Sequence, residues 1–424
     1  MRIIANEELR NLLLKGPTYR EPVNINWNKV LKEFKSGIAE CQIKWTQLEN
    51  KDLKTLDDWS NTIFDAIQKR VNKLKKVRKF HPRQRTKVLD RKDKNYLENF
   101  QKELVFVPTD KASNNISIVC KKFYVKTLLK EVGFFDLDRK QDRTYQEIKL
   151  TSEEIINLHE KENQTFGVTI DNKQYHLPLL LWIPKMHKNP SKQRFIAASH
   201  CCTTKNLSSL VSKSLKLIQK AHQVYCERIK NYSGYNLFWI VDNSLSVHKI
   251  LKQCDTKAKN LATYDFSTLY TSIPHKKLKI QISWVIEKAF KGMNKKYIKI
   301  NKFCARWSNK KDRNPDVIFV DSDTLVKMIA WLIDNTYVRI GDKVFRQVIG
   351  IPMGTDCAPF LANLFLFSYE FQWMYEKLKR KQFYLLNKFK HCCRYIDDLF
   401  AINNNKTLLR LKHKIYPPEL DNDR

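Results

Sequence analysis

Three aspartates interrupt the apolar pattern of this chain. Asp397 and Asp398 are adjacent within "RYIDDLFAI" (394–402), and Asp265 ends the run "NLATYD" (260–265). Adjacent carboxylates repel each other, and charges among apolar residues lose hydration, so a compensating cation is expected. Clusters of carboxylates hold two Mg²⁺ ions about 3.5–4 Å apart and support in-line phosphoryl transfer. The three residues predict such a metal site if their strands are neighbours.

The elements around these aspartates decide whether they meet. Each acid alone is an ordinary strand-end or turn residue, and a plain surface turn would also suit Asp397 and Asp398. Residues 260–266 alternate in the manner of a strand, and 389–405 predict two short apolar strands joined at the aspartates. In one shared sheet, the carboxylates would converge at a single edge.

Two long helices are predicted beside these strands. One covers 206–230 and has an apolar face, with Asn206 as its N-cap. The other follows a strand and a glycine turn within 344–380, with Asp356 as its N-cap and Pro359 in its first turn.

Charge and length restrict the partners. The chain has 424 residues, enough for two or three domains, and a net charge of +34. A field of that size favours polyanions, so nucleic acid is the first expected partner, an anionic membrane the second, and a solvated basic surface the plain alternative. The longest apolar stretches, 177–184 and 360–367, are shorter than a membrane span. Ten cysteines without CxxC spacing predict reduced thiols of an intracellular protein.

The N-terminal region is basic and predicted to be helical. Apolar residues recur at helical spacing from Leu56 to Leu74, and a positive run follows over 69–87. This run is interpreted as a phosphate-binding surface, with a solvated helix face as the alternative. The predicted nucleic-acid-binding residues are Lys73, Lys75, Lys76, Arg78 and Lys79.

Five sequence blocks occur in a fixed order. They are "TDKASNN" (109–115), "IPKMHKNPSKQRFIAAS" (183–199), "DFSTLYTSIPH" (265–275), "GIPMGTDCAP" (350–359) and "YIDD" (395–398). Together they resemble the finger and palm motifs of a reverse transcriptase. Their wording is most similar to the Penelope-like retroelement branch, a relative of telomerase. The resemblance extends over about residues 100–420.

The resemblance implies roles for individual residues. Asp265 and Asp397 would be the principal ligands of two Mg²⁺ ions (or Mn²⁺), Asp398 the third acid, and Phe266 a further metal ligand. Tyr270 would be the steric gate, because a ring beneath the sugar leaves no room for a 2′-hydroxyl. The implied nucleotide-binding residues are Lys185, Arg194, Phe266, Ser267, Tyr270, Met353 and Gly354.

For some of these residues, a different role or a different residue is also consistent with the sequence. Lys188 could replace Lys185, and both Lys185 and Arg194 could be surface cations of a hairpin turn. Asp110 and Lys111 match a block of the family, and either an ion pair that braces the fingers or a part in catalysis would explain them. Met353 stands where many reverse transcriptases have Gln, which weakens any expectation of hydrogen-bonded readout there.

The expected fold is α+β, a right-hand polymerase with fingers and palm, a mostly helical N-terminal region and no complete thumb. The predicted boundaries are 1–95 for the basic helical region, 96–235 for the fingers, 236–410 for the palm and 411–424 for the start of a missing thumb. The chain is thus expected to be truncated at its C-terminus.

The resemblance implies an RNA-directed DNA polymerase that uses an RNA template, a DNA primer and deoxynucleoside triphosphates, with no membrane partner. The alternatives are a catalytically inactive, nucleic-acid-binding remnant of such an element and an RNA-dependent RNA polymerase, although an aromatic gate at Tyr270 disfavours the latter. A nuclear location is expected, and a cytoplasmic one otherwise; 69–87 is the best import-signal candidate. The oligomeric state stays open.

Overall fold

The computed structural model of the chain contains two compact units. Unit 1 comprises Met1–Tyr124 and Ile183–Arg194, and unit 2 comprises Val125–Trp182 and Phe195–Arg424. The structure describes residues 4, 7–16, 26–49, 53–80, 91–135, 144–171, 175–189, 192–252, 254, 258–266, 269–314, 316–351, 355–404 and 406–420.

Before its first strand, the described part of unit 1 is mostly helical. Its elements are α1 (Glu7–Leu14), α2 (Trp27–Glu49), α3 (Leu53–Phe80), α4 (Arg91–Glu103), β1 (Leu104–Thr109) and β2 (Ala112–Cys120). The two strands form an antiparallel hairpin, and α5 (Lys121–Glu131) follows across the boundary into unit 2.

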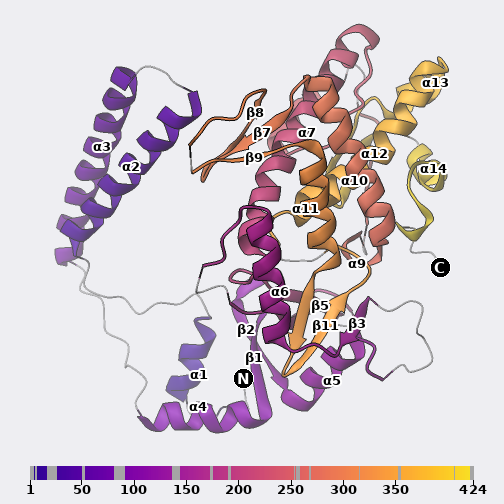
Figure 1. Ribbon diagram of the computed structural model, residues 1–424. Helices are drawn as coiled ribbons and strands as arrows, with labels where there is room; N and C mark the ends of the chain where they lie inside the picture. The colour runs from indigo at the N-terminus through magenta and orange to yellow at the C-terminus, as the bar shows by residue number, and fades with distance from the viewer. Residues whose placement is uncertain are drawn as a thin grey trace. The chain divides into compact units, whose positions relative to one another are not determined.

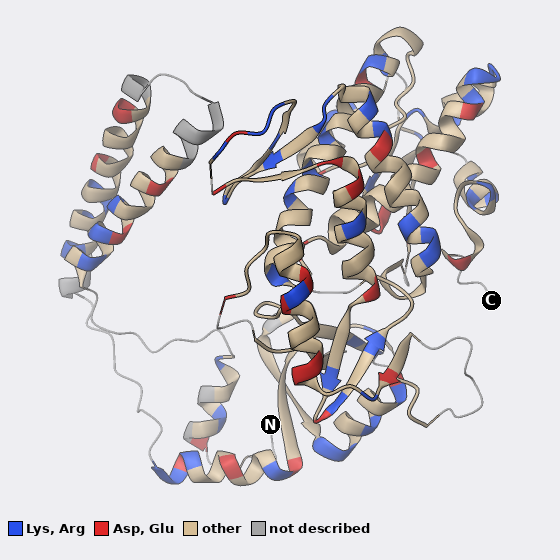
Figure 2. Ribbon diagram, viewed as in Figure 1, with Lys and Arg blue, Asp and Glu red and all other residues tan. Residues whose placement is uncertain are grey.

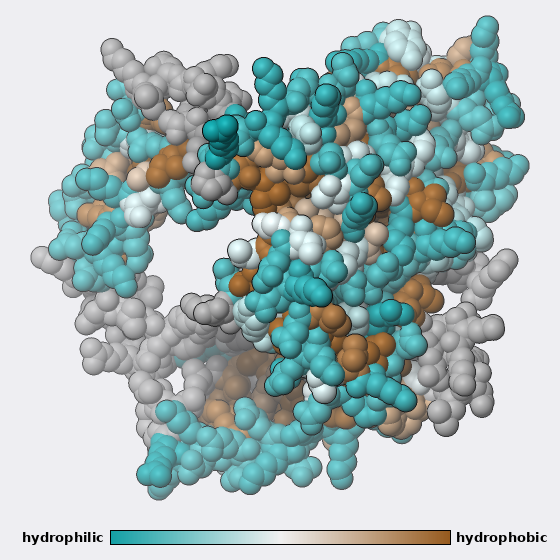
Figure 3. All heavy atoms as spheres, viewed as in Figure 1, coloured by the Kyte–Doolittle hydropathy of each residue, from teal (hydrophilic) through white to brown (hydrophobic). Residues whose placement is uncertain are grey.

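Helices α2 and α3 lie side by side (Figure 1). The predicted apolar face of α3 is only partly covered: Leu56 and Val71 are buried, whereas Trp59 and Leu74 are exposed. Figure 3 shows hydrophobic residues at the surface of this pair of helices. Lys and Arg recur along α3 (Figure 2).

The largest sheet has five strands in the order β3-β11-β10-β4-β5. β10 and β11 form an antiparallel hairpin, and β4 runs parallel to β10 with Leu179 opposite Arg339. β4 begins in unit 2 and ends in unit 1, and β5 begins in unit 1 and ends in unit 2. The strands are β3 (Tyr145–Ile148), β4 (Leu179–Lys185), β5 (Lys192–Ala198), β10 (Tyr337–Ile340) and β11 (Lys343–Gln347).

Four helices form the core of unit 2: α7 (Lys205–Ser233), α10 (His275–Met293), α11 (Ser322–Asp334) and α12 (Ala358–Lys379). They run alongside one another (Figure 1). The predicted apolar face of α7, from Leu210 to Ala221, is buried as expected. The first part of α12 is buried nearly all round, which is typical of a core helix.

Both predicted N-caps are wrong. The N-cap positions of α7 and α12 are Thr204 and Cys357, and neither makes a side-chain capping bond. Asn206 instead donates to the Thr169 carbonyl at 2.8 Å, and Asp356 pairs with Lys205 Nζ at 2.6 Å. Tertiary partners have replaced the local caps, while Pro359 lies in the first turn of α12 as predicted.

Two smaller sheets complete unit 2. One has the order β12-β13-β6, and the other has the order β8-β7-β9. The strands are β6 (Leu261–Asp265), β7 (Tyr297–Ile300), β8 (Ala305–Ser308), β9 (Ile318–Val320), β12 (Cys392–Tyr395) and β13 (Asp398–Ile402). The remaining helices are α6 (Ser152–Thr165), α8 (Ser244–Lys252), α9 (Leu269–Ser272), α13 (Phe383–Phe389), α14 (Thr407–Ile415) and the 3-10 helix η2 (Pro418–Leu420).

The fold is therefore a mixture of helix and sheet, as expected. The boundaries predicted at 95, 235 and 410 stay predictions. Within the described ranges, no helix combines the length and the apolar character that a membrane crossing requires.

Candidate functional site

The carboxylates predicted from sequence meet at one edge of the β12-β13-β6 sheet. β13 pairs antiparallel with β6, and Asp398 is the direct partner of Asp265. Directly opposed residues of antiparallel strands have Cα atoms about 4.5–5.5 Å apart and side chains on the same face. Both residues are exposed. β6 and β13 are thus neighbouring strands, and Asp265 and Asp398 lie side by side.

Asp397 lies in the tight turn that joins β12 to β13. Its carbonyl oxygen accepts a hydrogen bond from the Phe266 amide at 3.2 Å, which ties the turn to the end of β6. Asp397 is half-buried, unlike the other two aspartates. All three acids therefore belong to one corner of the sheet.

A buried arginine holds this turn. Arg394, on β12, is fully buried, and its Nη1 donates to the Ile396 carbonyl inside the turn at 2.7 Å. Its Nε and Nη2 donate to the two carboxylate oxygens of Glu370 on α12, at 2.6 and 3.1 Å. Its remaining donors reach the side chain and the carbonyl of Asn363, at 2.9 and 3.1 Å.

All five N–H donors of Arg394 are thus used, which is the full capacity of a guanidinium. Ile396 has a φ of +54°, a left-handed conformation that β-branched residues rarely adopt. Such strain persists only where the surroundings over-determine the backbone. The bond from Arg394 to the Ile396 carbonyl supplies this constraint, so the arginine positions the two aspartates that follow.

Tyr416 extends the same network to β6. Its hydroxyl donates to Glu370 Oε1 at 2.9 Å, and its ring makes an edge contact with Phe266 at 4.8 Å between centroids. Burial, and then the Glu370 charge, raise the pKa of Tyr416 well above its usual value. The tyrosine is therefore a neutral donor that connects Glu370 with the residue next to Asp265.

The predicted gate residue, Tyr270, lies close to the acids. Burial, followed by the negative charge of Asp397, raises the pKa of Tyr270 to about 12. A carboxylate can exert this effect only over a short distance. The Asp397 carboxylate therefore acts electrostatically on the Tyr270 hydroxyl, and the gate role of Tyr270 stays a prediction.

Gly350 brings the fourth sequence block, 350–359, against the α9 region. Its amide donates to the Ile273 carbonyl, and the Ile351 amide donates to the Tyr270 carbonyl, both at 2.8 Å. Gly350 has a φ of +93°, and a Cβ there would lie 2.3 Å from the Tyr270 carbonyl oxygen. Only glycine allows this approach. His275 Nε2 also lies 3.0 Å from the Gly350 carbonyl.

Both backbone groups of Phe266 make hydrogen bonds. Its amide donates to the Asp397 carbonyl, and its carbonyl accepts from the Leu269 amide at 3.1 Å. A carbonyl oxygen has two lone pairs, so one of them stays available to a metal ion. The roles expected of Phe266 in metal and nucleotide binding stay predictions.

The described residues contain no group of three or more His, Cys, Asp or Glu side chains close enough to hold a metal ion together. Mg²⁺ is commonly held by one or two protein carboxylates, with water and substrate phosphate completing its shell. Asp265 and Asp398 meet that requirement as donors, because like charges on directly opposite residues are unfavourable without a cation. The residues present therefore fit a hard divalent ion.

The predicted finger cations lie in unit 1. Arg194 Nη1 forms an ion pair with Asp110 Oδ1 at 3.2 Å, where the Asp110 side chain is 5% exposed and that of Arg194 44%. Asp110 Oδ2 is buried and lacks a hydrogen-bond partner among the described residues. The structure therefore shows the bracing ion pair that was one of the two readings of Asp110.

Lys185 belongs to the same cluster. Burial, and then the positive charge of Arg194, lower the pKa of Lys185. The Asp110 amide donates to the Pro184 carbonyl at 3.0 Å, which fixes the hairpin that carries both cations. Lys188 is exposed in the turn of that hairpin.

Several predicted residues lie outside the described ones. They are Ser267, Met353, Gly354 and the side chains of Arg78 and Lys79. Lys73 and Lys76 are exposed on α3, and Lys75 is half-buried there.

The prediction from sequence missed Arg394, Glu370 and Tyr416. A signal was available for the first two: each is a lone charge in an otherwise apolar run, "CCRYI" and "FLFSYEFQW". A charge in such a run is rarely buried unless it is paired.

Comparison with known proteins gives structural neighbours only. No family model and no curated protein matches this sequence. Telomerase from Candida albicans in complex with a fragment of telomeric RNA matches at 12% identity and TM-score 0.46, covering 78% of this chain and 52% of that one. The apo telomerase from Candida tropicalis truncated from its C-terminal domain matches at 12% identity and TM-score 0.47, covering 97% and 78%.

A third structure, telomerase from Candida tropicalis with a fragment of telomeric RNA, matches at 13% identity and TM-score 0.45. The alignment covers 76% of this chain and 46% of that one. The chain thus spans about half the length of the two RNA-bound telomerases.

Proposed function

We propose that this chain is an RNA-directed DNA polymerase of a Penelope-like retroelement, which adds deoxynucleotides to a primer 3′-hydroxyl. The observation that carries the proposal is the pairing of Asp265 with Asp398 across two strands, with Asp397 in the adjoining turn. Three sequence blocks far apart in the chain supply this corner and the adjacent Tyr270 and Gly350.

In this proposal the chain's own residues orient the reactants. Asp265, Asp397 and Asp398 would hold the Mg²⁺ ions, which, when bound, lower the pKa of an attacking hydroxyl and neutralise charge on the phosphate. Arg394 fixes the turn, so the two carboxylates next to it keep their position. The ring of Tyr270 fills the space that a 2′-hydroxyl would need, and so favours deoxynucleotides.

Phosphate recognition is assigned to Lys185 and Arg194. Arg194 is nearly half exposed, so it can contact a phosphate while Asp110 keeps its guanidinium oriented. The charge of +34 suits an RNA template and a DNA primer, both polyanions.

Primer extension on an RNA template with a DNA primer tests the proposal. The wild type is expected to extend the primer only with Mg²⁺ or Mn²⁺ present, and Asp397→Asn or Asp265→Asn to abolish extension. Asp342→Asn, in the exposed turn between β10 and β11, is the matched control and should leave extension unchanged. Extension that survives Asp397→Asn would refute the site.

The same assay separates the alternatives. If the wild type does not extend the primer but binds RNA with an affinity that falls steeply with salt, the chain is a non-catalytic nucleic-acid-binding remnant. Equal incorporation of ribonucleotides and deoxynucleotides would show that Tyr270 does not exclude the 2′-hydroxyl.

A further inference from the structure

Unit 2 contains a cavity of about 550 Å³ between α7, α10 and α12. It shares no lining residue with the carboxylate site. α10 begins at His275, which contacts Gly350, and its first residue lining the cavity, Trp284, follows nine residues later (284 − 275). At 1.5 Å per residue, the cavity begins about 14 Å farther along the helix axis. The two sites are therefore separate.

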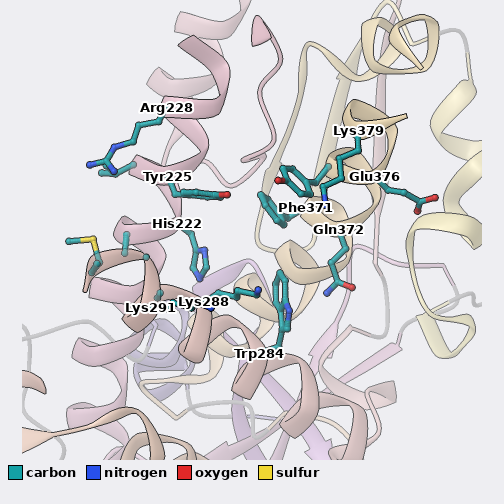
Figure 4. Close-up of a pocket in the computed structure, with 16 residues that line it drawn as sticks. His222, Tyr225, Arg228, Trp284, Lys288, Lys291, Phe371, Gln372, Glu376 and Lys379 are labelled. Carbon is teal, nitrogen blue, oxygen red and sulfur yellow. The ribbon is translucent and has the colours of Figure 1, made fainter. Parts of the chain in front are cut away.

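Aromatic rings from all three helices line the cavity (Figure 4). Phe371 lies 6.1 Å from both Tyr225 and Trp284 between ring centroids, and it stacks on Tyr375 at 5.4 Å with an interplanar angle of 14°. Tyr225 is 44% exposed, so this aromatic surface is open to a ligand. It presents flat π-faces suited to stacking.

Positive charge surrounds these rings. Arg228, Lys288, Lys291 and Lys379 line the cavity, and all four are exposed. Among the described residues none of them has an acidic partner within ion-pair distance. Glu376, the acid of the lining, is held by Arg380 at 3.0 Å. Lys379 Nζ lies over the Tyr375 ring at 4.8 Å from its centroid.

A second cavity of about 800 Å³ adjoins the first, and its lining contains four lysines and two acids, Asp321 and Asp323. Lys291 lines both cavities, and Lys295, Lys296 and Lys310 line the second. Tyr297 adds another ring there, with Lys311 Nζ 4.8 Å from its centroid. Cations thus continue from the aromatic cavity to the β8-β7-β9 sheet.

We propose that the cavity between α7, α10 and α12 binds single-stranded nucleic acid. A base stacks against the ring of Tyr225 and replaces Lys379 Nζ over the ring of Tyr375. The flanking phosphates contact Arg228, Lys288, Lys291 and Lys379. Rings on which bases stack, bordered by cations that follow the backbone, are the general means of binding single strands without sequence preference. An apolar peptide would cover the rings but leave the four cations without counter-charges. The proposal holds whether or not the chain polymerises.

Equilibrium binding of a labelled oligouridylate to the full chain tests this site. The titration is run at salt high enough to suppress binding through phosphates alone. Tyr375→Ala should weaken binding about tenfold, equivalent to about 1.4 kcal/mol, because a stacking face is lost. Tyr375→Phe, which keeps the face, should bind as the wild type does. A thermal unfolding curve of Tyr375→Ala that matches the wild type shows that folding is not the cause.

The chain offers a matched control pair on α13. Tyr384 and Lys388 have the same four-residue spacing, with Lys388 Nζ 5.4 Å from the ring centroid, but neither lines the cavity. Lys379→Glu should weaken binding, and Lys388→Glu should weaken it much less. Likewise Tyr384→Ala should have no effect.

Two results would overturn the proposal. Equal losses for Lys379→Glu and Lys388→Glu would mean that the whole basic surface binds, and an unchanged affinity of Tyr375→Ala would exclude stacking. Crosslinking gives an independent check: an oligonucleotide carrying 5-iodouridine should attach to Tyr225, Trp284 or Tyr375. Attachment confined to other residues would place the strand elsewhere.

Discussion

Arg394 and Arg194 each pair with a carboxylate near a predicted substrate-binding position. The two pairs differ in burial and in how many of their hydrogen-bonding groups have partners. The Arg394–Glu370 pair is wholly buried and uses every donor of the guanidinium. The Arg194–Asp110 pair is nearly half exposed on the arginine side, and one buried carboxylate oxygen has no hydrogen bond from any residue that the structure describes.

This difference separates two uses of an ion pair. A complete buried pair fixes the backbone, here the strained turn that carries Asp397 and Asp398. An incomplete pair orients an arginine while leaving part of it free for an anion. Removing one partner of a buried pair is strongly destabilising, whereas exposed pairs contribute little.

The largest effect is expected for Arg394→Met. The change leaves Glu370 buried and unpaired, so the free energy of unfolding should fall by about 3–5 kcal/mol in chemical denaturation. Arg380→Met removes an exposed partner of Glu376 and should cost less than about 1 kcal/mol. Equal losses for the two variants would contradict the contrast.

The double variant Arg394→Met/Glu370→Leu separates stability from positioning. An apolar pair of similar volume should recover much of the lost free energy. Primer extension should stay impaired, because the bond to the Ile396 carbonyl is still missing. If both the free energy of unfolding and primer extension recovered fully, Arg394 would have a structural role only.

Gly350→Ala tests how closely the carboxylate region is packed. The new Cβ meets the Tyr270 carbonyl at 2.3 Å and the backbone is left-handed, so unfolding should become easier by about 3 kcal/mol. Gly341→Ala is the control, because its φ of +59° is also left-handed but nothing lies within 4 Å of its Cβ. It should cost about 1 kcal/mol. Similar losses would show that crowding at Gly350 is unimportant.

His159 has a hydrogen-bond partner for one of its two ring nitrogens, so its hydrogen bonding is less complete than that of Arg394. Its Nδ1 is 2.7 Å from Thr203 Oγ1, whereas its Nε2 is buried without a partner among the described residues. Burial lowers the pKa of His159 to about 4. Because the folded pKa lies below the unfolded one of about 6.5, stability is present above pH 6.5 and is lost as the pH falls towards 4.

The expected loss attributable to His159 between pH 7.5 and pH 5 is about 2 kcal/mol. The measurement is the pH dependence of the free energy of unfolding for the wild type and for His159→Gln. The variant should show a shallower slope by that amount. Identical slopes would mean that His159 is not kept neutral by burial.

The smallest effect is expected for Asp110→Asn. Arg194 loses its partner but stays hydrated, so the free energy of unfolding should fall by about 1 kcal/mol. A loss as large as that of Arg394→Met, measured in the same denaturation series, would show that the two pairs are equivalent.

The sequence predicted the parts of the site that are local in the chain. Asp265 and Asp398 could be placed together because each marks the end of an apolar strand and the strands belong to recognisable blocks. The strain at Ile396 could not be predicted, because a β-branched residue in that conformation depends on the bond from Arg394.

The residues that the sequence did not predict correctly are those whose partners lie far away in the chain. Glu370 is 24 residues from Arg394, and Lys205 is 151 residues from Asp356. The residue preferences of helix N-caps predicted Asp356 as a cap, because the neighbouring sequence gives no sign of its distant partner Lys205. The helical faces, in contrast, were predictable since α7 buries the face that its spacing shows.

Mn²⁺ binding, followed by electron paramagnetic resonance, tests the central proposal that the paired acids Asp265 and Asp398, with Asp397 in the adjoining turn, bind divalent cations. The account predicts that the wild type binds Mn²⁺ and that Asp265→Asn, Asp397→Asn and Asp398→Asn each weaken binding about tenfold or more, while Asp342→Asn does not. Equal binding by the wild type and all four variants would contradict it.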